Sequence, residues 1–313
     1  MASALAIGGV CRLSDRGLIR AIGPDAATFL QGQLTNAVVT LDEGAARLAG
    51  FCSAKGRLQA TFVIWKAASD EYLLTCPASL LAPTLKRLSM FVLRARCKLS
   101  DASSDLQLFG VAGTVADVFL DGAAAWQTRR RGPANAISLP DAAGVRRGLV
   151  ALPAGVALDD ADAPTMTLDI WRWLEVQSGI VTIVAETVDR FVPQMVNFEL
   201  VGGIDFQKGC YPGQEVVARS HYRGTTRRRT FLFDCETTPT AGQDVFVAGD
   251  AGEAAGTVAN AAPRPEGIGG SALVEVRLAA LGGDDLRLGA PDGPRLRRAE
   301  LGYRVPLEAE PAR

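Results

Sequence analysis

The sequence has only one histidine, His221, among its 313 residues. A single imidazole excludes zinc sites that need two or more histidines, and a Ser-His-Asp triad would have to use His221. The chain also lacks an excess of charge of either sign, since it has 33 basic and 34 acidic residues and a net charge of −1. Because nucleic-acid-binding domains usually carry a basic excess, this balance argues against a general nucleic-acid binder.

Closely spaced cysteines and long apolar runs are absent too. The six cysteines are at least 21 residues apart, so the sequence contains no C-x-x-C pair for a metal or a redox disulfide. No apolar run approaches the roughly 20 residues that cross a bilayer, and the N-terminus lacks the charged start of a signal peptide. We therefore expect a cytoplasmic protein with reduced thiols and no membrane partner.

The chain is long enough for two domains, and its patterning changes along its length. Alternating strand and helix patterns fill the first two thirds: strands at 12–22, 47–53, 57–66, 72–76, 106–111 and 149–152, and helices at 26–34, 80–94, 115–120 and 165–180. Short strands separated by glycine turns then follow: 229–235, 244–248, 256–259, 272–278, 286–288 and 302–305. The second pattern predicts a small β-barrel or sandwich that begins near residue 229.

Although the net charge is near zero, acidic and basic residues are segregated in the middle of the sequence. Residues 155–205 hold nine acids and two arginines, whereas residues 205–229 hold six basic residues and two acids. The basic half could attract an anionic partner, or it could be a solvated face.

One stretch of the basic half, residues 208–215 (KGCYPGQE), combines a cysteine with glycines and a lysine. Pro212 suits the first position of a helix that continues to His221, which we expect to be a surface histidine. Cys210 would then lie at the helix N-terminus, where the dipole and Lys208 favour a thiolate. The alternative is that Cys210 is a buried apolar side chain, as free cysteines usually are.

These residues closely resemble the YgfZ family of folate-binding proteins, whose signature K-G-C-[FY]-x-G-Q-E is met in full. Flanking matches occur at 191–194, Asn197, 202–206, 217–219 and 223–224, with weaker ones at 29–35 and 54–57. The resemblance implies an α+β fold related to the glycine-cleavage T-protein: a folate-binding body of mixed antiparallel sheets and helices, followed by a small C-terminal β-barrel. We place the body at 1–228, with subdomains at 1–100 plus 155–228 and at 101–154, and the barrel at 229–313.

The resemblance further implies tetrahydrofolate as cofactor and a role in the synthesis or repair of iron–sulfur enzymes, which would be transient partners. It makes Cys210 the functional thiol. A folate needs polar groups for its pterin edge and basic groups for its carboxylates. The expected folate-binding residues are Lys208, Gly209, Tyr211, Gly213, Gln214, Glu215, Arg219, Arg223, Gln177 and Asn197. Two positions depart from relatives, which carry acids where this chain has Gln177 and Asn36.

Two other functions stay open. A folate-dependent aminomethyltransferase, or another one-carbon transferase, would need a carboxylate near residues 94–98, where the sequence has none. An RNA-binding module could use Arg227, Arg228 and Arg229, although few aromatic side chains lie among them for stacking.

Overall fold

The computed structural model describes residues 7–158, 163–222, 226–250, 252–265, 267–283 and 285–307. The chain forms two compact units: the first comprises Met1–Phe29, Val38–Arg47 and Val63–Trp171, and the second comprises Leu30–Ala37, Leu48–Phe62 and Arg172–Arg313. The domain boundaries expected from the sequence stay a prediction. Among the described residues, no helix is long and apolar enough to span a membrane.

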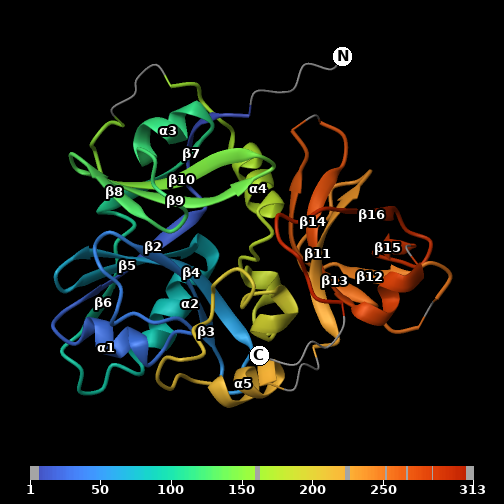
Figure 1. The fold of residues 1–313 in the computed structure, drawn as a ribbon, viewed down its shortest axis with the longest axis horizontal. Coiled ribbons are helices and arrows are strands. Elements are labelled where there is room, and N and C mark those ends of the chain that lie inside the picture. The colour runs from blue at the N-terminus through green and yellow to red at the C-terminus, as the bar shows by residue number, and fades with distance from the viewer. Residues whose placement is uncertain are drawn as a thin grey trace. The chain divides into compact units, whose positions relative to one another are not determined.

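The first sheet is antiparallel and belongs to the first unit (Figure 1). Its strands are, in order, β1 (Gly9–Arg12), β7 (Leu106–Ala112), β10 (Val145–Pro153), β9 (Ala134–Ala142) and β8 (Thr128–Arg131). Helix α3 (Thr114–Leu120) packs on β7 and β10, and buries Phe119 and Leu120 against Val111 and Val150. Removing these apolar side chains from water stabilises the layer.

A second sheet has five strands and contains those predicted at 47–53, 57–66 and 72–76, together with most of the one predicted at 12–22. Its order is β3 (Ala46–Cys52), β4 (Leu58–Ala68), β5 (Glu71–Pro77), β2 (Arg16–Ile22) and β6 (Lys98–Asp101). Helix α1 (Ala26–Gln31) follows β2, and α2 (Ala78–Ser89) packs on β2, β5 and β6. The helix predicted over 80–94 is wrong in its last turn. Its apolar stripe ends at the fully buried Leu88, and Met90 and Leu93 are exposed, so burial no longer favours the helix beyond Ser89.

The last six strands form a closed barrel, as the sequence predicts (Figure 1). They are, in barrel order, β11 (Arg228–Cys235), β14 (Gly270–Arg277), β13 (Gly256–Pro263), β12 (Asp244–Val247), β15 (Leu286–Leu288) and β16 (Arg295–Ala299). Their inward side chains, including Phe231, Val274 and Leu296, form a common core. The predicted strand at 302–305 is wrong, because β16 closes the barrel. The charged sequence of β16 buries only Leu296, so no apolar alternation marks it.

The remaining helices are α4 (Leu168–Gln177), α5 (Gln214–Tyr222) and three 3-10 turns, η1 (Ala185–Thr187), η2 (Pro193–Val196) and η3 (Leu278–Gly283). Gly179 follows α4 with a φ of +73°, a conformation that side chains oppose. The hydroxyl of Tyr303 donates a hydrogen bond of 2.8 Å to the Gly179 carbonyl, so this terminus is fixed within the second unit.

Candidate functional site

The signature residues form a loop that leads into helix α5, all within the second unit. The predicted helix over 214–221 is confirmed as α5, Gln214–Tyr222. The expected places of Pro212 and Cys210 at the start of the helix are wrong, because α5 begins only at Gln214, after Gly213 with a φ of +78°. The Gln214 N–H instead donates 3.2 Å to the carbonyl of Tyr211, so a tight turn precedes the helix.

Gly213 is required by its contact with a second glycine turn. A Cβ on Gly213 would lie 2.4 Å from the Ser53 carbonyl oxygen and 2.6 Å from the Gly56 Cα. Gly56 has a φ of +71°, and a Cβ there would lie 2.8 Å from the Cβ of Val216. The two turns that the sequence marks separately therefore pack together, and their lack of side chains allows the close approach.

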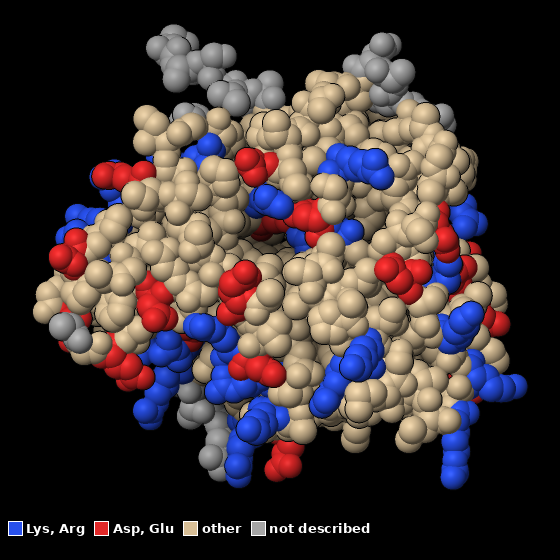
Figure 2. Space-filling view, turned by 180° about the vertical axis from the view of Figure 1, so that it is seen from behind, with Lys and Arg blue, Asp and Glu red and all other residues tan. Residues whose placement is uncertain are grey.

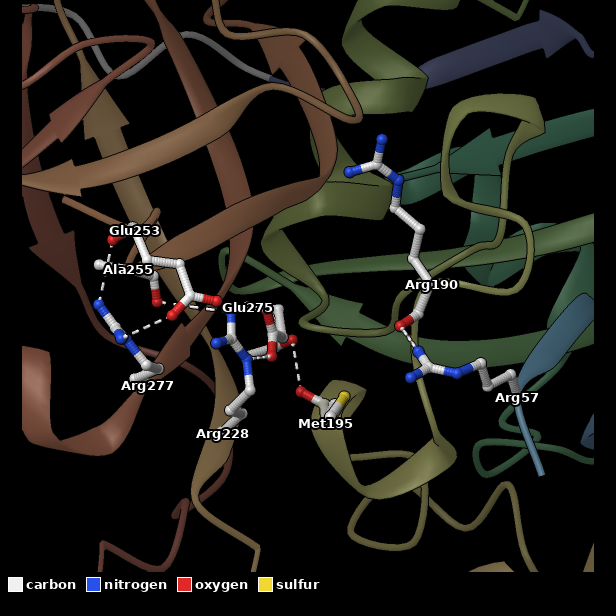
Figure 3. Close-up of polar contacts among 9 residues, drawn as sticks. Arg57, Arg190, Met195, Arg228, Glu253, Ala255, Glu275 and Arg277 are labelled. Carbon is white, nitrogen blue, oxygen red and sulfur yellow. Dashed lines mark hydrogen bonds and ion pairs between the residues drawn. The ribbon is translucent and has the colours of Figure 1, made fainter. Parts of the chain in front are cut away.

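Arg57, which follows the Gly56 turn, connects that turn to the segment at residues 189–190 through hydrogen bonds. Its guanidinium donates 2.5 Å to the carbonyl of Arg190 (Figure 3) and 3.4 Å to that of Asp189. The Leu58 N–H also donates 2.8 Å to the Phe191 carbonyl. The signature loop thus rests on a turn that is itself fixed by backbone contacts.

Cys210 is exposed, and the other five cysteines are buried. Burial raises the pKa of the Cys52 and Cys76 thiols to about 12, which keeps them protonated at neutral pH. The alternative that Cys210 is a core side chain is therefore wrong. Gly209 beside it is also exposed, and a Cβ there would find no atom within 4 Å. The residues of this loop that face solvent are the ones around the thiol.

Lys208, two residues away, is buried with 9% of its surface exposed. Its ammonium donates 2.5 Å to the Leu34 carbonyl, donates also to the Gln31 carbonyl, and lies 5.1 Å from the centroid of the Tyr211 ring. Burial lowers the pKa of Lys208 to about 8, against the opposing effects of Asp205 and Cys210. Tyr211 is buried as well, which raises the pKa of its hydroxyl. Lys208 therefore anchors the loop to the carbonyls at the end of α1.

Asn197 and Gln194 lie in the interior of the second unit, each 0% exposed. The Asn197 amide donates 2.7 Å to the Thr230 carbonyl and 3.3 Å to the Tyr303 hydroxyl. The Gln194 amide donates 2.7 Å to the Val217 carbonyl. These side chains tie η2 to the first barrel strand and to α5, and the donors of Asn197 are used there.

The other expected site residues are more accessible. Gln177, the last residue of α4, and Gln214 are half-buried, and Glu215 and Arg219 are exposed on α5. Glu215 and Arg219 are four residues apart, so they share one face of the helix. Arg223 lies outside the described residues. His221 stacks on Phe206, with ring centroids 3.9 Å apart and planes inclined by 17°.

Asn36, which stands where the resemblance implies an acid, has a structural role. Its amide donates 2.8 Å to the Leu48 carbonyl and 2.7 Å to the Gly202 carbonyl. Neighbouring Thr35 donates 2.6 Å to the Gly203 carbonyl and accepts 2.7 Å from the Gly50 N–H. An ionised aspartate has no hydrogen to donate, so only an amide can make both Asn36 contacts. The sequence singled out this position but not these partners.

The basic run at 227–229 is largely neutralised by ion pairs. Arg228 donates 2.9 Å to Glu275, as Figure 3 shows, and Arg229 pairs with Glu199. Burial raises the pKa of Glu199 despite this partner. On the face shown in Figure 2, basic and acidic side chains are interspersed. The arginine run is therefore a weak basis for binding a polyanion.

The comparisons with known proteins first define the class. The GCVT N-terminal domain model matches residues 7–130. The crystal structure of glycine cleavage system aminomethyltransferase T from Bartonella henselae matches with a TM-score of 0.74 at 15% identity, covering 96% of this chain and 86% of that chain. The chain therefore has the T-protein-like fold, and the α+β fold predicted from the sequence is confirmed.

Sequence relatives then narrow the class. The chain is 34% identical over 270 residues to the tRNA-modifying protein YgfZ of Edwardsiella ictaluri, covering 79% of this chain and 78% of the relative. It is 32% identical over 241 residues to the protein of that name from Vibrio vulnificus, covering 74% and 72% respectively. The chain belongs to the YgfZ family.

Proposed function

We propose that this protein is an accessory factor that binds a reduced folate and uses the Cys210 thiol in the synthesis or repair of iron–sulfur enzymes. The observation that carries this proposal is the exposure of Cys210 on an anchored loop, while the other five cysteines are buried. A thiol that acts on a second protein must be reachable, and a buried one is inert. One thiol cannot hold a four-thiolate cluster, so the cluster is cargo or substrate that remains with the partner.

The name of the relatives suggests the process that is assisted. The proteins from Edwardsiella and Vibrio are called tRNA-modifying proteins. We extend this to the present chain by proposing that the assisted iron–sulfur enzyme modifies tRNA. The accessory factor itself need not bind tRNA, which agrees with the ion pairs of Arg228 and Arg229.

The folate would be held by the accessible side chains of the site. Gln177 can donate and accept hydrogen bonds at a pterin edge, and the exposed Arg219 can bind a carboxylate of the glutamate tail. The open space at Gly209 leaves room beside the loop. Lys208 and Asn197 would act as positioning residues, because their donors bind carbonyls and a hydroxyl of the protein. When bound, a reduced folate supplies a carrier for one-carbon groups.

Calorimetric titration with tetrahydrofolate and with folic acid tests this assignment. We expect saturable binding of tetrahydrofolate and about tenfold weaker binding by the Arg219→Gln variant, since a charge-assisted hydrogen bond contributes about 1.5–3 kcal/mol. Gln207→Ala, an exposed change in the same segment, should leave the affinity unchanged. An absence of saturable binding would remove folate from the proposal, and unchanged affinity in Arg219→Gln would remove Arg219 from the site.

The T-protein-like fold leaves a folate-dependent aminomethyltransferase as the alternative. The fold does bring a carboxylate to residues 94–98, because Asp25 accepts 2.8 Å from the Arg96 N–H and also binds its guanidinium. These hydrogen bonds lower the pKa of Asp25 and make it a poor base. Robust methylene transfer from an aminomethyl-lipoyl carrier to tetrahydrofolate would replace the accessory role with this enzymatic one.

A further inference from the structure

An exposed apolar surface follows helix α2 in the first unit. Met90 is 60% exposed and Leu93 is 85% exposed, and Phe91 between them is exposed as well. The stripe of α2 that packs on its sheet ends at Leu88, so these three side chains lie beyond that core. Large apolar side chains that cluster on a surface mark an interaction site, whereas those scattered singly do not. We call Met90, Phe91 and Leu93 the apolar patch.

The backbone that carries the apolar patch is ordered by its own hydrogen bonds. The Phe91 N–H donates 3.0 Å to the Leu88 carbonyl, and the Leu93 N–H donates 3.0 Å to the Phe91 carbonyl. Beyond the patch, the Arg96 N–H donates 2.8 Å to Asp25 Oδ2. The patch therefore lies on successive turns that are anchored at both ends, and binding a partner costs little ordering of this segment.

Basic side chains flank the apolar patch, and the sequence has no acidic residue from 72 to 100. Lys86, Arg87 and Arg94 are all exposed. The Arg87 guanidinium lies 5.7 Å from the centroid of the Phe91 ring. The side chains of Lys86 and Arg94 form no hydrogen bond or ion pair with any residue that the structure describes. The edge of the patch thus offers positive charge that no described carboxylate neutralises.

The helix dipole accounts for only part of this charge. Lys86 and Arg87 lie in the last turn of α2, where the dipole favours cations, but Arg94 lies after the helix has ended. Arg94 therefore has no role within the described part of the fold, although it is held next to the fully ordered turn of Leu93. A basic group in that place is available to an acidic partner.

The composition of the apolar patch favours a protein partner over a membrane or a nucleic acid. Methionine, aromatic residues and arginine are the types enriched at protein interfaces. A membrane needs more apolar area, because a single myristoyl chain already binds only marginally and three partly exposed side chains offer less. A single-stranded nucleic acid stacks its bases on several aromatic rings, and the patch has one.

We propose that the apolar patch docks a segment of a partner protein in which apolar side chains are flanked by aspartates or glutamates. The apolar side chains would cover the patch, and the carboxylates would pair with Lys86 and Arg94. The apolar contacts supply most of the affinity, and the basic edge excludes basic segments. The proposal does not rest on the folate or on Cys210, because the patch shares no residue with the signature loop or α5.

Selection of random twelve-residue peptides displayed on phage, against the immobilised full chain, tests this surface. We expect the enriched peptides to combine apolar side chains with aspartate or glutamate. As synthetic peptides they should bind Leu93→Asp at least about tenfold more weakly than wild type, since a central apolar contact is lost. Arg94→Gln should weaken them about threefold, because a charge at an exposed edge contributes little.

Two matched variants control for general surface effects. Val118→Asp changes another exposed apolar side chain of the first unit, and Arg12→Gln changes another exposed arginine of that unit. Both should leave peptide binding unchanged. Equal affinity of the peptides for wild type and Leu93→Asp, enrichment of basic peptides, or no enrichment at all would each overturn the proposal.

Two further measurements detect a different occupant. Sedimentation of wild type, but not of Leu93→Asp, with vesicles of phosphatidylserine and phosphatidylcholine would overturn the proposal in favour of a membrane. A wild-type dimer that Leu93→Asp dissociates in analytical ultracentrifugation would overturn it in favour of a second copy of this chain. We expect neither result.

Discussion

At the scale of single residues, the signature loop places a thiol and an ammonium group in opposite environments. Cys210 is exposed, whereas Lys208 is buried beneath the loop with its ammonium bound to carbonyls. The sequence places both residues in one motif. From the sequence alone, Lys208 is expected to bind an anion, like the other basic residues of this segment. Only the fold distinguishes a group that meets solvent from a group that holds the loop.

Thiol labelling tests the difference among the cysteines. In the native protein at pH 7.5, Ellman's reagent should modify one thiol per chain, and this thiol should be absent in Cys210→Ala. The reason is that the other five thiols are buried, and that those of Cys52 and Cys76 have a pKa of about 12. In guanidinium chloride all six should react. Rapid modification of a second thiol in the native protein would contradict the described burial.

The pKa of Lys208 predicts a pH dependence of stability. Its value is about 8 in the folded state against an ordinary 10.5, so the unfolded chain binds more protons between these pH values. The free energy of unfolding should therefore rise with pH through this window, by about 3 kcal/mol from this group alone.

The comparison of wild type with Lys208→Met in urea unfolding at pH 7.5, 9 and 10.5 isolates this contribution. The variant should lose the rise, and Lys55→Met, a change in the Gly56 turn, should keep it. A wild-type and a Lys208→Met curve that run parallel across these pH values would show that burial does not shift this group.

At the scale of elements, the signature motif is a turn-and-helix unit whose glycines carry different constraints. Gly213 packs against the Gly56 turn in a left-handed conformation, whereas Gly209 faces open space. The motif contains both glycines, and nothing in the sequence shows which of the two positions cannot accept a side chain.

Alanine at each glycine measures this difference. Gly213→Ala should lower the free energy of unfolding by about 2–4 kcal/mol, because it combines an unfavourable φ with a Cβ 2.4 Å from a carbonyl oxygen. Gly209→Ala should stay within about 0.5 kcal/mol of wild type. Chemical denaturation gives both values, and equal effects would contradict the packing of the two turns.

The elements also show how far the sequence predicts this fold. Most barrel strands follow from apolar patterning, because one face of each is buried. Helix α5 was predicted from Pro212, which lies two residues before its first residue. Strands β6 and β8 were not predicted, since each lies at the edge of its sheet and carries charged side chains such as Lys98 and Arg130. Strand β9, between β10 and β8, was missed as well. The contact of Gly213 with Gly56 depends on the tertiary fold, so no local pattern reveals it.

At the scale of the whole molecule, the YgfZ assignment and the T-protein-like fold agree with the resemblance carried by residues 208–215. The near-neutral net charge became informative only once the structure showed which acidic and basic side chains form ion pairs. The arginines at 228 and 229 follow one another in sequence, yet each meets a glutamate from a distant segment. The sequence is therefore enough to indicate the family and the candidate thiol. Only the structure shows what the basic side chains contact.

Complementation is the most direct test of a role for the Cys210 thiol. A bacterial strain lacking its own YgfZ would express the wild type, Cys210→Ala or Gln207→Ala at equal levels, with tRNA modification by an iron–sulfur enzyme measured by mass spectrometry. We expect the wild type and Gln207→Ala to restore the modification, and Cys210→Ala to fail to restore it. Full restoration by Cys210→Ala would contradict this role.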